Sequence, residues 1–103
     1  MGLLMILHTL NKPPRAPAAI ACLEVLTASS EDGDSLLLLE DGVYMADNSN
    51  EELVRQVPTK IYALDLDIEA RGLAHRVLPS IKVISYADFV QLVVEHKMTK
   101  AWI

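Results

Sequence analysis

Cys22 is the side chain with the strongest nucleophilic chemistry in this chain of 103 residues, and it is the only cysteine. A cysteine reacts as its thiolate, so its pKa and its access to solvent decide whether it attacks a substrate. Ala19, Cys22 and Leu26 follow the spacing of the buried side of a helix. Free cysteines are among the most buried residue types. Two interpretations therefore stay open: a core residue, or a thiol that accepts sulfur in transfer chemistry.

Two adjacent carboxylates, Glu40 and Asp41, directly follow a run of four leucines at residues 36–39. Such a run predicts a strand buried on both faces, and open α/β sheets bind ligands beyond the carboxyl ends of their strands. The pair could act as a general acid and base or as metal ligands. The alternative is that Asp41 caps the following turn or pairs with a basic residue of a partner, because short acidic side chains favour caps and turns.

His8 follows a first predicted strand at residues 3–7, which would place it at the same sheet edge as Glu40. Together with Asp41, these residues could form a small-molecule site. The three histidines show no metal-ligand spacing with the cysteine. The chain also lacks the glycine-rich motifs that hold dinucleotides and nucleoside triphosphates. We therefore expect no metal and no cofactor.

The elements that must position these side chains follow from apolar runs that alternate with helical patterns. Strands are predicted at residues 3–7, 35–39, 60–64, 81–84 and 101–103. Helices are predicted at residues 17–27, 49–57, 65–71 and 86–96, with a helical turn at 42–47. This alternation predicts a three-layer α/β/α sandwich with a mainly parallel sheet of about five strands. A chain of this length is expected to form a single domain, residues 1–103.

Local signals define the ends of these helices. Ser49 with Glu52 resembles a capping box, and Ser85 with Asp88 forms the same pattern before the last helix. Gly72 is a natural helix terminator. The last helix is expected to turn an apolar face to the core. That face comprises Phe89, Val90, Val93 and Val94, with Leu92 beside it.

The composition narrows the class of protein. A net charge of −5 disfavours autonomous nucleic-acid binding, because phosphate recognition needs clustered Lys and Arg. No apolar run reaches the length of a membrane span, and the amino-terminal stretch lacks the basic region of a signal peptide. A lone cysteine suits a reducing cytoplasm. Hydrophobic residues make up 51% of the chain, a modest excess that favours contact with another subunit.

Four blocks of sequence, taken in order, resemble the DsrH/TusB family. They are residues 7–12 (LHTLNK), 38–44 (LLEDGVY), 62–73 (YALDLDIEARGL) and 86–92 (YADFVQL), followed by His96 and Trp102. The resemblance implies a DsrEFH-like α/β/α fold and a place in a cytoplasmic complex that relays persulfide sulfur. It further implies a heterohexamer with two sister subunits of the same fold, TusC/TusD-like or DsrF/DsrE-like, in two copies each.

The resemblance also implies how roles are divided in that complex. The principal sulfur-accepting cysteine belongs to a sister subunit, so this chain would have a mainly structural role. A downstream carrier protein would receive sulfur through the complex. Some family members carry a cysteine that matches Cys22, so an accessory sulfur carrier at this position stays open. The residues expected at partner interfaces are His8, Glu40, Asp41, Tyr44 and Trp102.

Two further questions stay open at the level of sequence. In the tRNA branch of the family, the relay supports 2-thiolation of the wobble uridine, whereas a related complex serves dissimilatory sulfur oxidation. The residues do not separate these branches. They also leave open whether the isolated chain forms a homo-oligomer when its sister subunits are absent.

Overall fold

The computed structural model describes residues 5–30 and 32–103, which form one sheet of five parallel strands. The strands lie in the order β4-β3-β2-β1-β5. Their bounds are β1 Ile6–Leu10, β2 Ser35–Leu38, β3 Lys60–Leu64, β4 Ile81–Ile84 and β5 Met98–Trp102. Leu10 of β1 pairs with Leu38 of β2 on one side and with Trp102 of β5 on the other. The last strand therefore returns to the first, and β4 and β5 form the two edges.

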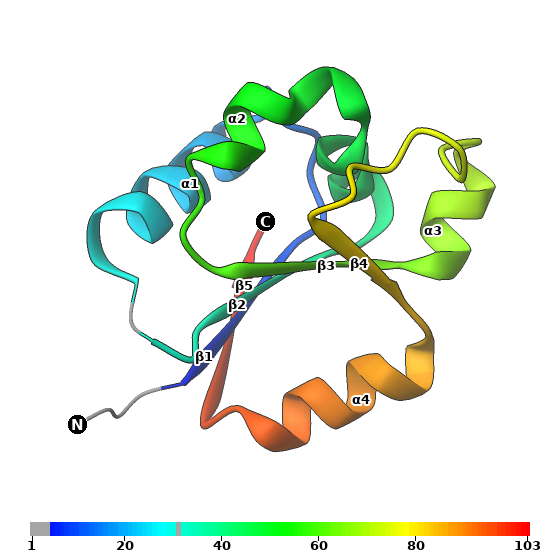
Figure 1. The fold of residues 1–103 in the computed structure, drawn as a ribbon. Coiled ribbons are helices and arrows are strands. Elements are labelled where there is room, and N and C mark those ends of the chain that lie inside the picture. The colour runs from blue at the N-terminus through cyan, green and yellow to red at the C-terminus, as the bar shows by residue number, and fades with distance from the viewer. Residues whose placement is uncertain (1–4, 31) are drawn as a thin grey trace.

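Helices cover the two faces of this sheet unequally. Their bounds are α1 Pro17–Ser29, α2 Glu51–Arg55, α3 Asp65–Ala70 and α4 Tyr86–Glu95, with 3₁₀ turns at Glu40–Ala46 and Asn48–Asn50. Among the described elements, α1, α2 and α3 lie on one face and α4 lies on the other (Figure 1). The predicted α/β/α sandwich is thus confirmed. No helix within the described residues has the length and apolar character needed to cross a membrane.

The run of leucines in β2 is explained by burial on both faces of the sheet. Leu36 and Leu38 join the larger core beneath α1, α2 and α3. Leu37 joins the smaller core beneath α4, and all three side chains are fully buried. Because successive side chains of a strand point to opposite faces, a central strand covered on both sides needs apolar residues at every position.

The first strand lies later in the chain than predicted. It begins at Ile6 and ends at Leu10, whereas the expected strand was residues 3–7, of which 3 and 4 lie outside the described residues. His8 and Thr9 are therefore part of β1, and the prediction that His8 follows the first strand was wrong. Pairing with β2 and β5 on its two sides supplies hydrogen bonds that hold the polar His8 within the strand.

One of the two predicted capping boxes is confirmed. The Ser85 hydroxyl accepts a hydrogen bond from the Asp88 N–H at 3.1 Å, and the Asp88 carboxylate accepts one from the Ser85 N–H at 3.3 Å. The box predicted at Ser49 and Glu52 is wrong, because the N-cap of α2 is one residue later. The Ser49 N–H instead donates to the carboxylate of Asp47 at 2.9 Å.

Three valines of α4 that were predicted to face the core are exposed, so the prediction was wrong for them. Leu92 is buried and Phe89 is half-buried against the sheet. Val90, Val93 and Val94 are 48%, 42% and 71% exposed. A single helix on a sheet buries only the arc that faces the strands, and the apolar arc of α4 is wider than that. The exposed valines therefore belong to a second face of the helix.

Candidate functional site

Cys22 lies on α1, inside the core between that helix and the sheet. Its side chain has no exposed surface. Burial raises the pKa of the Cys22 thiol to about 12, and the positive charge of Lys100 offsets only part of that effect. At neutral pH the sulfur therefore carries a proton, and in this conformation it is shielded from a sulfur donor.

His8 does not lie at the sheet edge, contrary to the expectation. It pairs with Leu36 in the interior of β1, and its exposed fraction is 3%. Glu40 comes four residues after Leu36, which is roughly 13 Å farther along the strands at about 3.3 Å per residue. The structure therefore does not bring His8 together with Glu40 and Asp41, and the small-molecule site expected from these residues is not assembled.

Trp102 on β5 is the partner of His8. The indole N–H donates a hydrogen bond to Nδ1 of His8 at 3.1 Å, so the neutral imidazole carries its own proton on Nε2. The two rings stack with their centres 6.2 Å apart, and the Lys100 ammonium lies 4.7 Å from the centre of the indole. These contacts tie the edge strand β5 to β1.

The carboxyl end of β2 runs into a tight turn that packs against the end of β1. A Cβ atom on Gly42 would lie 2.0 Å from the backbone oxygen of Leu10, so only glycine fits there. The same oxygen accepts a hydrogen bond from the Leu39 N–H at 2.9 Å. Glu40 adopts a φ of +48°, in the left-handed region that side chains other than glycine rarely enter. Close contact with β1 thus fixes the backbone of this acidic turn.

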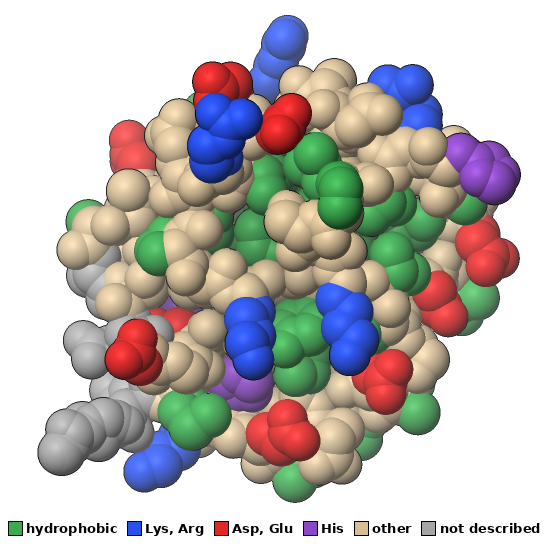
Figure 2. Space-filling model, viewed as in Figure 1, with side chains coloured by type: hydrophobic (Ala, Val, Ile, Leu, Met, Phe, Trp, Pro, Cys, Tyr) green, Lys and Arg blue, Asp and Glu red, His purple; other side chains and the backbone are tan. Residues whose placement is uncertain are grey.

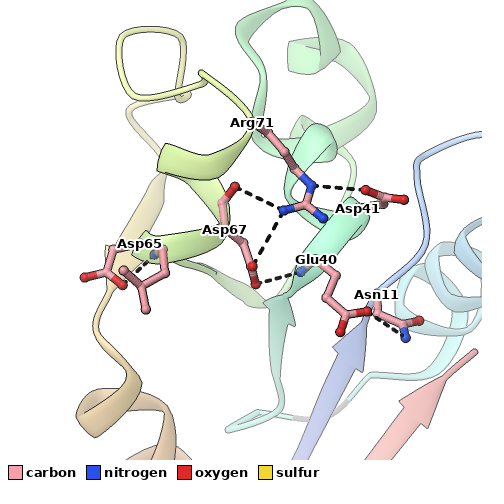
Figure 3. A network of polar contacts seen from close by, with 7 residues as sticks. Asn11, Glu40, Asp41, Asp65, Asp67 and Arg71 are labelled. Carbon is pink, nitrogen blue, oxygen red and sulfur yellow. Dashed lines mark hydrogen bonds and ion pairs between the residues drawn. The ribbon is translucent and has the colours of Figure 1, made fainter.

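A polar network holds the turn from the side of α3 (Figure 3). The Asp67 carboxylate accepts a hydrogen bond from the Glu40 N–H at 2.7 Å and lies 3.6 Å from the Arg71 guanidinium. Arg71 Nε donates to the Asp41 carboxylate at 3.0 Å. At the end of β1, Asn11 Nδ2 lies 3.5 Å from Glu40 Oε1. Asp41 therefore pairs with a basic residue of its own chain, and the two carboxylates stabilise the turn rather than face one reacting atom.

The rim around this turn is acidic. Asp65, the first residue of α3, adds a further carboxylate, which accepts a hydrogen bond from the Leu66 N–H at 2.6 Å. Arg71 is the one basic residue labelled in this network (Figure 3). Within residues 5–30 and 32–103, no group of three or more His, Cys, Asp and Glu side chains is placed to hold a metal ion. The exposed carboxylates of Glu40 and Asp41 give this rim a negative charge at the surface of the chain.

An ion pair between Asp47 and Arg76 was missed by the sequence analysis. Arg76 Nε donates to the Asp47 carboxylate at 2.5 Å, and Arg76 Nη2 donates to it at 3.2 Å. Hydrogen bonds from Arg76, and then from Ser49, hold the pKa of Asp47 well below its usual range. Asp47 and Val77 also form an antiparallel bridge. The pair spans 29 positions, so no local spacing could have revealed it.

Comparison with known proteins assigns the chain to a family. The family model described as DsrH like protein matches residues 15–99. Protein TusB of Shigella flexneri is 43% identical over 99 residues, which cover 94% of this chain and 100% of that protein. This chain belongs to the DsrH/TusB family. Protein TusB of Escherichia coli strain K12/DH10B is 42% identical over the same length.

The fold of this DsrH/TusB chain is also found in a solved structure. The crystal structure of the ychN protein from E. coli aligns with a TM-score of 0.74, covering 96% of this chain and 99% of that one. The two sequences are 12% identical, so the likeness concerns the fold.

The five residues expected at partner interfaces fall into two groups in this DsrH/TusB chain. Glu40, Asp41 and Tyr44 are exposed together on the turn after β2. Trp102 is half-buried on β5 and covers His8, which is buried. The first group is therefore exposed on the surface of this chain, whereas His8 is buried within it.

Proposed function

We propose that this chain is a subunit of a cytoplasmic sulfur-relay complex that supports 2-thiolation of the wobble uridine of tRNA. Its role is mainly structural: it forms part of the surface that positions the persulfide cysteine of another subunit. Membership of the DsrH/TusB family supports the assignment to the relay. The burial of the single cysteine supports the structural role.

The environment of Cys22 is the observation that carries this proposal. In persulfide transfer, a thiolate attacks the outer sulfur of a donor persulfide, the sulfur–sulfur bond breaks, and the donor leaves as a thiolate. A buried thiol with a pKa of about 12 is poorly suited to that attack. In the proposed relay, Cys22 is a core residue of α1 and the cysteines of partner subunits carry the sulfur.

The proposed partners are two sister subunits of the same fold, TusC/TusD-like or DsrF/DsrE-like, in a heterohexamer with two copies of each. A downstream carrier protein takes sulfur onward from the complex. The exposed turn bearing Glu40, Asp41 and Tyr44 is the proposed contact surface, together with the half-buried Trp102. Its acidic rim would attract Lys and Arg side chains of a neighbouring subunit.

Direct contact with tRNA is assigned to another component. The chain has a net charge of −5. On the face viewed in Figure 2, Lys and Arg side chains lie among Asp, Glu and hydrophobic side chains and form no continuous basic surface there. Recognition of a phosphate backbone depends on clustered positive charge, so this surface is a poor match for RNA.

Complementation in cells that lack this chain tests the proposal. Wild type and Cys22→Ala are each expected to restore 2-thiolation of the wobble uridine, measured by mass spectrometry of digested tRNA. On co-expression, both are expected to co-elute with the two sister subunits in size-exclusion chromatography. A wild-type chain that neither restores thiolation nor co-elutes would contradict the proposal.

The same experiment separates the two alternatives. If Cys22→Ala folds and co-elutes but fails to restore thiolation, Cys22 is itself a sulfur carrier. If the wild-type chain co-elutes but leaves tRNA unthiolated, the branch that serves dissimilatory sulfur oxidation is favoured. The 43% identity to a TusB protein favours the tRNA branch.

A further inference from the structure

Ser35 and His96 form a hydrogen-bonded pair that has no part in the proposed sulfur relay. Ser35 is the first residue of β2, and His96 directly follows α4, 61 positions later. The Ser35 hydroxyl oxygen lies 3.1 Å from Nε2 of His96. Nδ1 of His96 lies 2.6 Å from the backbone oxygen of Leu92, in the last turn of α4. The imidazole is therefore held between a hydroxyl group and a carbonyl group.

These two contacts determine which ring nitrogen of His96 carries the proton. A carbonyl oxygen only accepts hydrogen bonds, so Nδ1 must donate its proton to the oxygen of Leu92. In the neutral imidazole Nε2 is then an acceptor, and the Ser35 hydroxyl donates to it. A hydroxyl that donates to a base, which is itself oriented by a third group, is the arrangement of an activated serine nucleophile.

Both side chains line a cavity of about 460 Å³. It lies where α4 ends and where β1, β2, β3 and β5 begin (Figure 1). Ser35 comes two residues before Leu37 of the core beneath α4, so its side chain points to the α4 side of the sheet. Ser35 is only 4% exposed, so the cavity is its route to a substrate. The volume falls within the range of small-molecule sites, roughly 300–1,000 Å³.

Lys60 brings a positive charge to the same cavity. It is the direct partner of Ser35 in the pairing of β3 with β2, so the two side chains leave the sheet on the same face. Lys60 also lines the cavity. Within the part of the chain that the structure describes, no carboxylate forms an ion pair with Lys60. An ammonium group beside a serine nucleophile can stabilise the negative charge that develops on a carbonyl oxygen under attack.

We propose that Ser35, His96 and Lys60 form an acyl-transfer site that hydrolyses small, uncharged carboxylic esters. Ser35 Oγ attacks the ester carbonyl carbon while its proton passes to Nε2 of His96, and the carbonyl oxygen becomes an oxyanion beside Lys60. The bond to the leaving alcohol breaks, and the alcohol takes the proton from His96. Water then gives a proton to His96 and attacks the acyl-serine. The acid is released, and Ser35 recovers its proton from His96.

The charges around the cavity define the substrate class. Asp32, Asp34 and Glu95 also line it, which places three carboxylates against the ammonium of Lys60. Repulsion by these carboxylates disfavours an acyl group that carries a negative charge of its own. Leu92 lines the cavity as well and supplies apolar surface for a short hydrocarbon chain. We therefore expect esters with short, uncharged acyl groups to be the preferred substrates.

Labelling with an alkyl fluorophosphonate tests the nucleophile. The serine oxygen forms a bond to phosphorus, fluoride leaves, and the serine proton passes to the base. The wild-type chain is expected to gain one phosphonyl group, which peptide mass spectrometry should place on Ser35. His96→Gln is expected to slow labelling by at least about 100-fold. The matched control is His75→Gln at an exposed position, which should react at the wild-type rate.

Hydrolysis of p-nitrophenyl butyrate tests turnover and the role of Lys60. Ser35→Ala is expected to reduce hydrolysis to the rate of wild type whose Ser35 has been blocked by the fluorophosphonate. Lys60→Met is expected to lower kcat by at least about tenfold. Lys82→Met, an exposed position on β4, is the matched control and should leave kcat unchanged. Circular dichroism and thermal unfolding verify that the variants fold.

Two results would overturn the proposal. One is a wild-type chain that gains no adduct on Ser35, and the other is labelling of His96→Gln at the wild-type rate. The first is measured on the wild-type chain, so it holds even if a variant fails to fold. The outcome is also independent of the proposed function. If Ser35→Ala loses esterase activity but still co-elutes with the sister subunits and restores thiolation, both proposals stand.

Discussion

The indole N–H of Trp102 donates a hydrogen bond to Nδ1 of His8 across 94 positions of sequence. The two residues belong to the last and the first strand of the sheet, which are neighbours in space. His8 is buried, so this bond satisfies a ring nitrogen that water does not reach. A residue that looked like an exposed candidate for chemistry is thus a core residue that fixes the position of β5.

Trp102→Phe removes the hydrogen-bond donor and keeps an aromatic ring against His8. Because Nδ1 is then left without a partner, we expect the free energy of unfolding to fall by about 1–3 kcal/mol. Urea denaturation measures it. The matched control is Tyr44→Phe, which removes a polar group from a residue that is 40% exposed and should change stability by less than about 0.5 kcal/mol. Equal stabilities of the two variants would argue against a structural role for the bond.

The titration of His8 should make stability depend on pH near neutrality. Burial lowers the pKa of His8 in the folded state, against a smaller raising effect of Asp34. The unfolded state therefore binds the proton more readily. Stability should be complete above the unfolded pKa of about 6.5 and should decline as pH falls from there to the folded pKa. Urea unfolding across this range measures the slope, and His8→Gln should reduce it. If the free energy of unfolding of His8→Gln varies with pH as steeply as that of wild type, then groups other than His8 cause the pH dependence.

Asp47 should make a separate contribution at acidic pH. The Arg76 guanidinium lowers the pKa of Asp47 in the folded state, so the unfolded state takes up the proton first. The stabilisation is present above the ordinary pKa of an aspartate, about 4, and it is lost as pH falls below that value. Asp47→Asn should therefore lower stability at neutral pH and flatten the acid dependence. The matched control is Asp32→Asn at an exposed position, which should leave the free energy of unfolding at neutral pH unchanged.

Alanine substitutions at Gly42 and Gly72 should distinguish the cost of a steric clash from the cost of an unfavourable backbone conformation. In Gly42→Ala, the new Cβ would lie 2.0 Å from the backbone oxygen of Leu10, so the turn must move and the loss should exceed about 3 kcal/mol. Gly72 has a φ of +68° and no atom within 4 Å of the added Cβ, so Gly72→Ala should cost about 1–2 kcal/mol. Thermal unfolding compares them. A milder effect at Gly42 than at Gly72 would contradict the contact between the turn and β1.

Much of the fold could be predicted from local sequence. The bounds predicted for β3 and β4 agree with the structure, and the capping box before α4 is present. These features depend on residues that are close together in the sequence, so a short stretch of sequence is enough to predict them. The end of β1 could not be predicted in this way, because His8 and Thr9 belong to a strand that pairs with the distant strands β2 and β5.

The candidate site was also predicted only in part, because some of its contacts join residues that are far apart in the sequence. Glu40 and Asp41 do lie at the carboxyl end of β2, as the leucine run before them indicated. Their partners are Asp67 of α3 and Arg71, the residue that follows α3, and the partner of His8 comes from the last strand. Contacts over such separations depend on the sheet order, which periodicity alone does not specify.

We propose that this chain positions a persulfide carried by a partner subunit and does not carry sulfur itself. Intact mass spectrometry of the assembled complex, after incubation with a persulfide donor, tests it most directly because each subunit is weighed separately. We expect an added sulfur atom on a sister subunit and none on this chain, with the same result for Cys22→Ala. An added sulfur on the wild-type chain that disappears in Cys22→Ala would contradict it.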